Sequence, residues 1–336
     1  MVTKLLLVLM HHVGHVPEGV LRTLSNLAAD LAWALHMGGV PQLERNLRHV
    51  MGPLPRVRLR QMSRESLRSY FAYFCEALTV GARTPDELMA RVRTEGSGYP
   101  DPARSDIPFR SVPIAMGHQG NWDYAGFWAG HELGHVTTVA ERLADQELLE
   151  AFVRIRTGLG MTILLTGQEG LIQRLTDRLH DAGQVVPLLA DRDLSRNGVF
   201  VHAFDSVIRV AAGPAVLALD TDLPLYTVNM HRERLHGARR RRAKNPYGYV
   251  CRIDGPIDIT PYRDLPRGQA VQRLTQAWVD QWAVNIRSHP QDWHMMQPIF
   301  VEDLDSSRLH NVPPQLREVM QSHGNRRREQ EDGRDR

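Results

Sequence analysis

The sequence predicts an α/β fold with a central mixed, largely parallel sheet flanked by helices, preceded by a helical N-terminal region. From residue 111 onward, short apolar runs alternate with helix-length segments, and glycines stand at many of the joints. Before residue 95, apolar residues instead recur mainly at helical spacing. Strand–helix alternation is typical of a sheet that carries helices on both faces. We therefore expect a helical region over 1–95, an α/β core over 96–305 and a polar, disordered tail over 306–336.

The strands of the core are predicted where short apolar runs are bounded by turn residues. One pair departs from the alternation, because Asp205 and Ser206 separate two apolar runs without an intervening helix. This pattern predicts an antiparallel hairpin inserted in the order of the sheet. Strands are expected at 112–116, 136–140, 162–165, 184–190, 199–204, 207–211, 224–229 and 248–254, and helices at 121–133, 144–158, 168–182, 213–221 and 269–288.

The N-terminal region is predicted to contain helices over 20–36, 43–51 and 63–80. The first is amphipathic, with leucines at positions 21, 24, 27, 31 and 35. The last is unusually aromatic, with Tyr70, Phe71, Tyr73 and Phe74 within five residues. Such a stripe favours either core packing or a surface for an acyl chain or membrane.

The composition is that of a soluble globular protein, with 42% hydrophobic and 24% charged residues. The two cysteines, Cys75 and Cys251, lie far apart, which argues against a disulfide framework or a thiolate metal site. The apolar run 5–10 is too short to span a bilayer. The basic block at 239–242 with Lys244 is either a solvated loop or a contact for acidic headgroups. We expect a cytosolic chain that rests on a membrane without crossing it.

His118 and Asp123 are the leading candidates for chemistry. The run 111–116 feeds a turn that carries Gly120, and a helix is predicted to begin at Asn121. Ligand sites of α/β sheets gather at this edge, beyond the carboxyl ends of the strands. An imidazole beside a carboxylate is a general base with a fixed tautomer, although Asp123 is also suited to stabilise the positive helix end. The backbone N–H groups of Gly120 and Asn121 are the expected donors to a developing oxyanion.

Charged residues also follow other predicted elements. Glu141 follows the strand 136–140, and Arg192 follows the strand 184–190 between two aspartates. If the strands are parallel, both lie at the same edge as His118. Arg156 stands near the end of the helix 144–158. The simpler interpretations are an ion-pair network for Arg192 and compensation of the helix C-terminus for Arg156.

Several enzyme classes are disfavoured. The chain has no Walker A loop, no G-x-G-x-x-G after a strand and no G-x-S-x-G elbow, which argues against nucleotide hydrolysis, dehydrogenation and serine hydrolysis. The stretch 131–135 reads as H-E-x-x-H, a zinc-protease signature. Gly134 and the β-branched run after it predict that the helix ends inside the motif, so a zinc hydrolase is kept only as an alternative.

The H-x-x-x-x-D box at His118 and Asp123 resembles that of the glycerophosphate and lysophospholipid acyltransferase superfamily. Its local form, residues 117–123, is similar to the branch that contains lipid A late acyltransferases and phosphatidylinositol mannoside acyltransferases. The resemblance covers about residues 15 to 305. Further stretches favour the mannoside enzymes, namely 46–48, 69–70, 139–143, Arg156 with 159–161, 189–194, 212–215 and 289–295.

The resemblance implies a glycerophosphate acyltransferase-like fold and transfer of a fatty acyl group from acyl-CoA to a mannose hydroxyl of a phosphatidylinositol mannoside. It implies that His118 is the base and that Asp123 orients it. Glu141, Arg156 and Arg192 would surround the polar headgroup. Acyl-CoA is a co-substrate, and no cofactor, metal or nucleic acid is expected. The enzyme would sit peripherally on the cytoplasmic face of the cell membrane, against anionic lipid.

One position departs from the pattern of the mannoside enzymes. Where Gly-Val-Glu-Val is expected, this chain has glycine, valine, Phe200 and valine over 198–201, and a phenylalanine cannot supply the acid. The acceptor therefore stays open between a mannoside, another glycolipid and a lysophospholipid. A catalytically degenerate lipid-binding homologue is a further alternative.

Overall fold

The computed structural model describes residues 16–98, 111–193, 195, 197–310 and 312–317. Its strands are β1 (Val92–Glu95), β2 (Val112–Met116), β3 (His135–Ala140), β4 (Thr162–Leu165), β5 (Gln184–Leu189), β6 (Val199–Ala203), β7 (Ser206–Val210), β8 (Leu225–Arg234) and β9 (Tyr247–Ile257). A seven-stranded sheet with the order β1-β9-β8-β2-β5-β3-β4 forms the centre of the molecule. From β8 to β4 the strands are parallel, and β9 is antiparallel to β8.

This sheet confirms the predicted α/β class, and every strand expected in the core is present. Two details differ from the prediction. The hairpin β6–β7 pairs only with itself, as a separate two-stranded sheet, so the mixed character of the main sheet comes from β9 instead. The strand β1 lies in the region expected to be helical and pairs with β9 at the sheet edge. Its sequence, Val-Arg-Thr-Glu, is too short and polar to signal a strand by itself.

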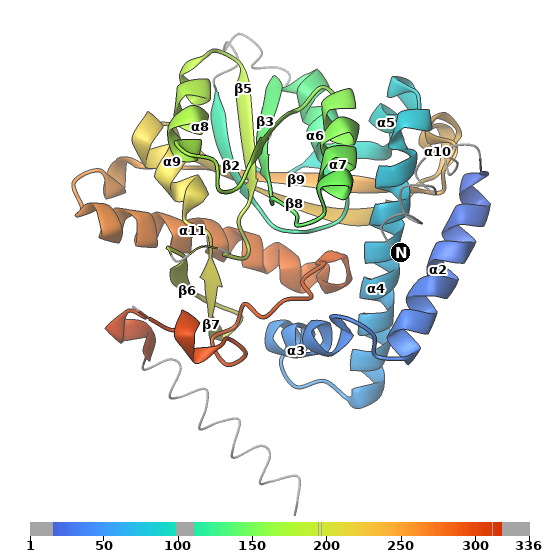
Figure 1. Ribbon diagram of the computed structural model, residues 1–336, viewed down its shortest axis with the longest axis horizontal. Coiled ribbons are helices and arrows are strands. Elements are labelled where there is room, and N and C mark those ends of the chain that lie inside the picture. Colours follow the sequence, from blue (N-terminus) through green and yellow to red (C-terminus); the bar gives the residue numbers. More distant parts are fainter. Residues whose placement is uncertain (1–15, 99–110, 194, 196, 311, 318–336) are drawn as a thin grey trace, which may run out of the picture.

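Helices lie on both faces of the sheet (Figure 1). One face is covered by α5 (Pro85–Arg91) and α6 (Trp122–Glu132), and the other by α8 (Leu171–His180), α9 (Gly213–Thr221) and α11 (Arg267–Ser288). The remaining helices are α2 (Glu18–Ala34), α3 (Val40–Met51), α4 (Arg56–Thr79), α7 (Gln146–Gly158) and α10 (Gly237–Ala243), with 3-10 turns η2 (Val80–Ala82), η4 (Thr260–Tyr262), η5 (Pro290–Asp292) and η6 (Ser306–Arg308). Among the residues that the structure describes, no helix has both the length and the apolar composition that a bilayer crossing requires.

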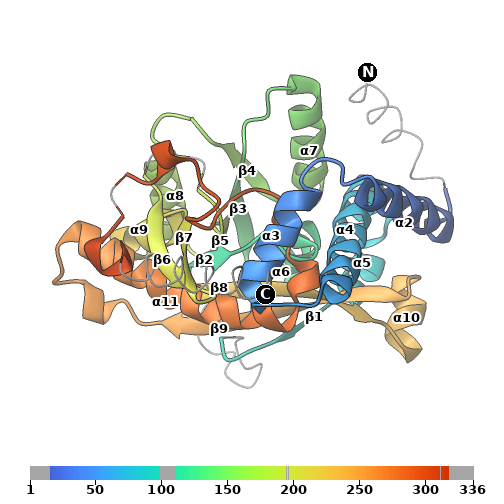
Figure 2. The ribbon, with the colours of Figure 1, turned by 90° about the horizontal axis from the view of Figure 1, so that it is seen from below.

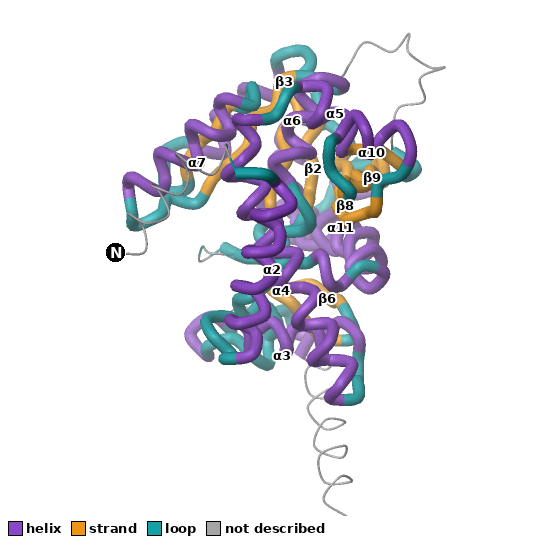
Figure 3. The backbone as a smooth tube through the Cα atoms, turned by 90° about the vertical axis from the view of Figure 1, so that its right-hand side faces the viewer, coloured by secondary structure: helices purple, strands orange, loops and turns teal. Residues whose placement is uncertain are grey.

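The three predicted N-terminal helices are present as α2, α3 and α4. Figures 2 and 3 show α2 and α4 side by side, and Figure 2 shows the hairpin β6–β7 on the opposite side of the molecule. Asp30 of α2 joins the two helices, because Arg64 and Arg68 of α4 each donate two hydrogen bonds to its carboxylate. Those hydrogen bonds, first from Arg64 and then from Arg68, hold the pKa of Asp30 well below its usual range.

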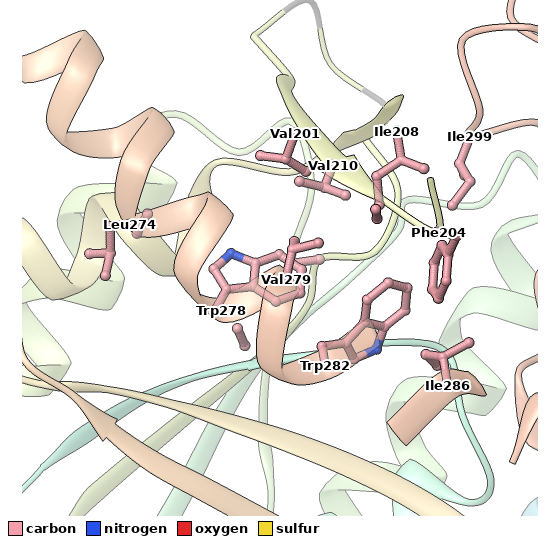
Figure 4. Close-up of a cluster of buried hydrophobic side chains, with 14 of the residues drawn as sticks. Val201, Phe204, Ile208, Val210, Leu274, Trp278, Val279, Trp282, Ile286 and Ile299 are labelled. Carbon is pink, nitrogen blue, oxygen red and sulfur yellow. The ribbon is translucent and has the colours of Figure 1, made fainter. Parts of the chain in front are cut away.

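The largest core cluster lies between α11 and the hairpin (Figure 4). Leu274, Trp278, Trp282 and Ile286 recur every four residues along α11 and are fully buried. They meet hairpin side chains that include Val201 and Ile208. Residues four apart lie on the same helix face, so this period explains why α11 buries one continuous stripe.

Truncation of this stripe should lower the stability of the whole chain. Leu274→Ala is expected to reduce the free energy of unfolding by about 2–5 kcal/mol, because it removes buried methyl groups and leaves a cavity. Val284→Ala is the matched control on the same helix, since Val284 is 65% exposed, and should stay within about 0.5 kcal/mol of the wild type. Urea unfolding measures both variants. Equal effects of the two substitutions would contradict the assigned packing of α11.

Candidate active site

The site is built where two neighbouring parallel strands end. Met116 at the end of β2 pairs in register with Leu189 at the end of β5, so the residues that follow each strand meet at the same sheet edge. His118 and Asp191 lie there, as the parallel arrangement predicts. The Nδ1 atom of His118 lies 2.6 Å from an oxygen of Asp191, and the His118 backbone N–H donates to the other oxygen at 2.9 Å.

Asp191 is completely buried and its carboxylate oxygens accept a further hydrogen bond, from the Trp293 indole N–H at 2.8 Å. Burial alone would raise the pKa of Asp191, but the charge and hydrogen bonds of His118 lower it overall, so the carboxylate stays ionised. Gly117 is required beside it. A Cβ atom at that position would lie 2.6 Å from Trp282 Nε1 and 2.9 Å from an oxygen of Asp191.

Asp123 does not orient His118, which corrects the role implied by the sequence. Its two oxygens accept hydrogen bonds from Arg156 Nε at 2.8 Å and from the Tyr73 hydroxyl at 3.1 Å. The physical reason is the direction of the side chain: Asp123 stands in the first turn of α6 and faces α4 and α7. Burial by itself would lower the pKa of Arg156, but Asp123 raises it overall, so the guanidinium keeps its charge. Asp123 therefore holds Arg156 in place.

Gly120 and Asn121 build the turn and do not line the cavity beside His118. The Gly120 N–H already donates to the Asp292 carbonyl at 2.9 Å, which removes it as an oxyanion donor. Gly120 has a φ of +53°, and a Cβ there would lie 2.9 Å from Met230, so glycine is required. Asn121 caps α6 by accepting from the Tyr124 N–H, and its amide donates to buried Glu76 at 2.9 Å. The geometry therefore gives these two residues a structural role and does not support the prediction that they bind substrate.

A cavity of about 1110 Å³ opens beside His118. Part of its lining is polar and is called the polar belt here: Glu141 and Arg192 make an ion pair of 2.8 Å, and Arg156 makes an ion pair with Asp123. The apolar lining residues form two groups, called arms here. One arm is aromatic and contains Tyr70, Tyr73, Phe74, Trp122 and Met296, and the other is aliphatic and contains Leu171, Leu175, Leu188, Leu189 and Val216. His118, Glu141, Arg156 and Arg192 are thus brought together from four segments of the chain, as expected.

Sequence reasoning missed two residues of this site besides Asp191. Tyr73 was assigned to an aromatic stripe, but its hydroxyl joins Asp123 and Arg156. His294 lines the cavity, donates its backbone N–H to the His118 carbonyl at 2.7 Å, and places Nε2 3.1 Å from the Ser69 hydroxyl. Burial lowers the pKa of His294 to about 3, so its ring is neutral. His294 carried a sequence signal, since it belongs to the stretch 289–295 that resembles the mannoside enzymes, whereas Tyr73 stands three residues beyond the stretch 69–70.

The H-E-x-x-H stretch does not form a zinc site. The helix α6 ends at Glu132, and His135 begins β3, so the two histidines do not share a helix face. His131 contacts the Phe127 carbonyl, and His135 contacts the Thr162 hydroxyl. Among the described residues, no three histidine, cysteine or acidic side chains are grouped as metal ligands would be. The zinc-hydrolase alternative therefore has no geometric support.

Phe200 is not among the residues that line the cavity. It is buried in a small cluster with Val207, Val301, Val312 and Leu316. Its ring lies 5.7 Å from the guanidinium of Arg209, which makes an ion pair with the cavity residue Asp193. The predicted tail 306–336 falls only partly within the described residues, and residues 325–336 lie outside them.

The chain is similar to known bacterial acyltransferases. Residues 1–301 match the model of the bacterial lipid A biosynthesis acyltransferase family. A phosphatidylinositol mannoside acyltransferase of Mycolicibacterium smegmatis is 35% identical over 289 residues, which cover 83% of this chain and 86% of that protein. Proteins of the same name from two strains of Mycobacterium tuberculosis are 32% and 34% identical over 301 residues, which cover 88% of this chain and 87% of theirs. The chain belongs to the bacterial lipid A biosynthesis acyltransferase family.

Proposed function

We propose that this protein transfers a fatty acyl group from acyl-CoA to a hydroxyl of a glycolipid, with the mannose of a phosphatidylinositol mannoside as the acceptor. The observation that carries the proposal is the pair of His118 with buried Asp191, in which His118 lines a cavity that has apolar arms. The names of the similar proteins support a glycolipid acceptor over a lysophospholipid.

The His118–Asp191 pair is suited to general base catalysis. Because Nδ1 faces the ionised carboxylate, it carries the proton, and the Nε2 lone pair is left to accept one. Nε2 takes the proton of the acceptor hydroxyl as the oxygen attacks the thioester carbonyl. Asp191 stabilises the imidazolium that forms. Collapse of the tetrahedral intermediate expels the thiolate of CoA, which takes the proton from Nε2, so the base is regenerated without a covalent enzyme intermediate.

The polar belt is suited to a charged sugar headgroup. Arg156 is held on Asp123 as a permanent cation, which favours a phosphate or a sugar oxygen. Glu141 is about half exposed and can accept hydrogen bonds from sugar hydroxyls, with Arg192 fixing its position. The aliphatic arm, between β5, α8 and α9, offers an apolar site for the acyl chain. The aromatic arm extends to Gly39 at the start of α3 and accommodates the lipid end of the acceptor.

Removal of the base should abolish most of the transfer. His118→Ala is expected to lower turnover of palmitoyl-CoA with a phosphatidylinositol mannoside by about 10²–10⁴-fold, the usual range for general acid–base catalysis. His131→Ala is the matched control, because His131 lies in α6 and does not line the cavity; it should keep near-native turnover. Mass spectrometry of the lipid product measures both. Near-native turnover by folded His118→Ala protein would refute the assignment.

The proposed localisation is the cytoplasmic face of the cell membrane, and we infer that α2 supplies the contact. Leu24, Leu27, Leu31 and Leu35 are each 57–62% exposed and lie along one face of this helix. Met37, which is 56% exposed, follows these leucines and stands two residues before Gly39, which lines the cavity. We propose that a lipid leaving the bilayer there enters the aromatic arm. A leucine face such as this one is typical of a helix that lies in the membrane interface.

The basic block is a weaker candidate for this contact. It forms the short helix α10, and its charges are partly compensated within the protein. Arg239 makes an ion pair with Glu233, Arg242 with Asp86, and Lys244 with Glu87. Arginines that are already paired contribute less attraction to anionic lipid than free ones do.

Replacement of the leucine face should therefore weaken membrane binding. The triple variant Leu24→Ser, Leu27→Ser, Leu31→Ser is expected to lower partitioning onto anionic vesicles at least about tenfold, because each buried leucine contributes about 1.5–3 kcal/mol. Val284→Ser, an equally exposed apolar residue on α11, is the control and should bind like the wild type. Vesicle flotation gives the measurement. Unchanged flotation of the triple variant would rule out α2 as the contact.

A further inference from the structure

A second cavity lies apart from the one beside His118. It has a volume of about 310 Å³, is open to solvent and is lined by residues of α2, α4, the end of β8, the start of β9 and η5. The two cavities share none of their lining residues. Neither the acyl transfer nor the membrane contact described above uses this second cavity.

The second cavity holds guanidinium groups with unused hydrogen-bond donors. Within the described residues, no carboxylate lies in ion-pair range of Arg232 or Arg234. The Arg232 guanidinium stacks at 3.8 Å on the ring of Tyr247, and its buried Nε has no hydrogen-bond partner there. Arg68 donates hydrogen bonds from Nε and Nη2 to Asp30, so its other terminal nitrogen, Nη1, remains available as a donor. Several N–H donors without a partner therefore belong to residues that line this cavity.

Two of the three acidic groups of the wall already accept hydrogen bonds or make ion pairs. Asp292 accepts from the Ser69 hydroxyl at 2.7 Å and from the Arg232 backbone N–H at 3.0 Å, and burial raises the pKa of this carboxyl. Glu233 is occupied by Arg93 and Arg239. Glu65 is the wall carboxylate that stays exposed and has no ion-pair partner among the described residues. The wall thus carries the guanidinium groups of Arg232 and Arg234 against the carboxyls of Glu65 and Asp292, and Arg68 adds positive charge because it shares the single carboxylate of Asp30 with Arg64.

From this arrangement we infer that the second cavity binds a phosphate group, through Arg232 and Arg234 with Arg68 beside them. Arginine donates several N–H bonds in a fixed fork that matches phosphate oxygens, and stacking on Tyr247 holds the fork of Arg232 in place. The amides of Asn26 and Gln291 line the same space and add neutral donors. The phosphate is either that of an anionic phospholipid headgroup, since α2 borders the cavity, or a free phosphate.

The cavity is connected to the catalytic histidine by a short chain of hydrogen bonds. The Ser69 hydroxyl, bound to Asp292, lies 3.1 Å from Nε2 of His294, and the His294 backbone N–H donates to the His118 carbonyl. The Asp292 carbonyl also holds the Gly120 N–H. An anion that orders Arg232 and Asp292 therefore also orders the turn that carries His118. This effect on turnover rests on the proposed function, whereas phosphate binding does not.

Phosphate binding is tested by thermal unfolding of the full chain in sodium phosphate against sodium chloride of equal ionic strength. Saturating phosphate should raise the Tm of the wild type by about 2 °C or more. The double variant Arg232→Gln, Arg234→Gln should lose this rise. The control variant Arg240→Gln, Arg241→Gln removes the same amount of charge from exposed positions of α10 and should keep the phosphate-dependent rise in Tm. Glu65→Gln should make the phosphate-dependent rise in Tm larger, because the substitution removes an unpaired carboxylate from the cavity wall.

Two results would overturn the inference: no phosphate-dependent rise in the wild type, or an equal rise in the wild type and in the Arg232–Arg234 double variant. If that double variant does not fold, Arg234→Glu alone, at an exposed position, should abolish the rise, and an undiminished rise would equally overturn the inference. Binding to phosphatidylcholine vesicles with and without phosphatidylinositol shows whether the bound phosphate is that of a lipid headgroup or free phosphate. If free phosphate competes with the phosphatidylinositol-dependent binding, the ligand is the lipid headgroup. If phosphate raises the Tm but does not compete with vesicle binding, the ligand is free phosphate.

Discussion

The hydrogen bond between His118 Nδ1 and the buried carboxylate of Asp191 is the interaction on which the site depends. It fixes the tautomer of the imidazole and leaves Nε2 as the acceptor of a proton. A buried carboxylate is costly unless its oxygens are satisfied, and here the His118 backbone and the Trp293 indole complete that set. Trp293 comes from the segment after α11, so the C-terminal part of the chain completes the hydrogen bonds of the His118–Asp191 pair.

A second carboxylate, Asp123, organises the rest of the polar belt. It joins α4, α6 and α7 through Tyr73 and Arg156, and it keeps a permanent cation at the cavity. The two acidic residues therefore have different partners: Asp191 pairs with His118, the proposed base, and Asp123 pairs with Arg156, the group proposed to meet the acceptor. This division also explains why the aromatic stripe of α4 is more than core packing, since Tyr73 closes the hydrogen-bond network between the helices.

The fold class and the sheet edge could be predicted from the sequence because both depend on local pattern. Apolar runs and helical periods located the strands, and the parallel arrangement then placed His118, Glu141 and Arg192 at the same edge. The partner of His118 could not be predicted in this way. Asp123 is near in sequence, whereas Asp191 is adjacent only because β2 and β5 are neighbours in register. Gly120 was misassigned for a similar reason: its N–H is used by Asp292, a contact made by distant chain segments. Strand β1 escaped notice because an edge strand of four partly polar residues has no period to detect.

The central claim, that His118 and Asp191 act as one unit in acyl transfer, is tested most directly by a double-mutant cycle on turnover. Residues that act as a unit are strongly non-additive. The account predicts that Asp191→Asn lowers turnover in the wild type and causes no further loss in the His118→Ala background, with product formation from palmitoyl-CoA and a phosphatidylinositol mannoside as the readout. A loss of the same factor in both backgrounds would show that Asp191 acts independently of His118, which would contradict the account.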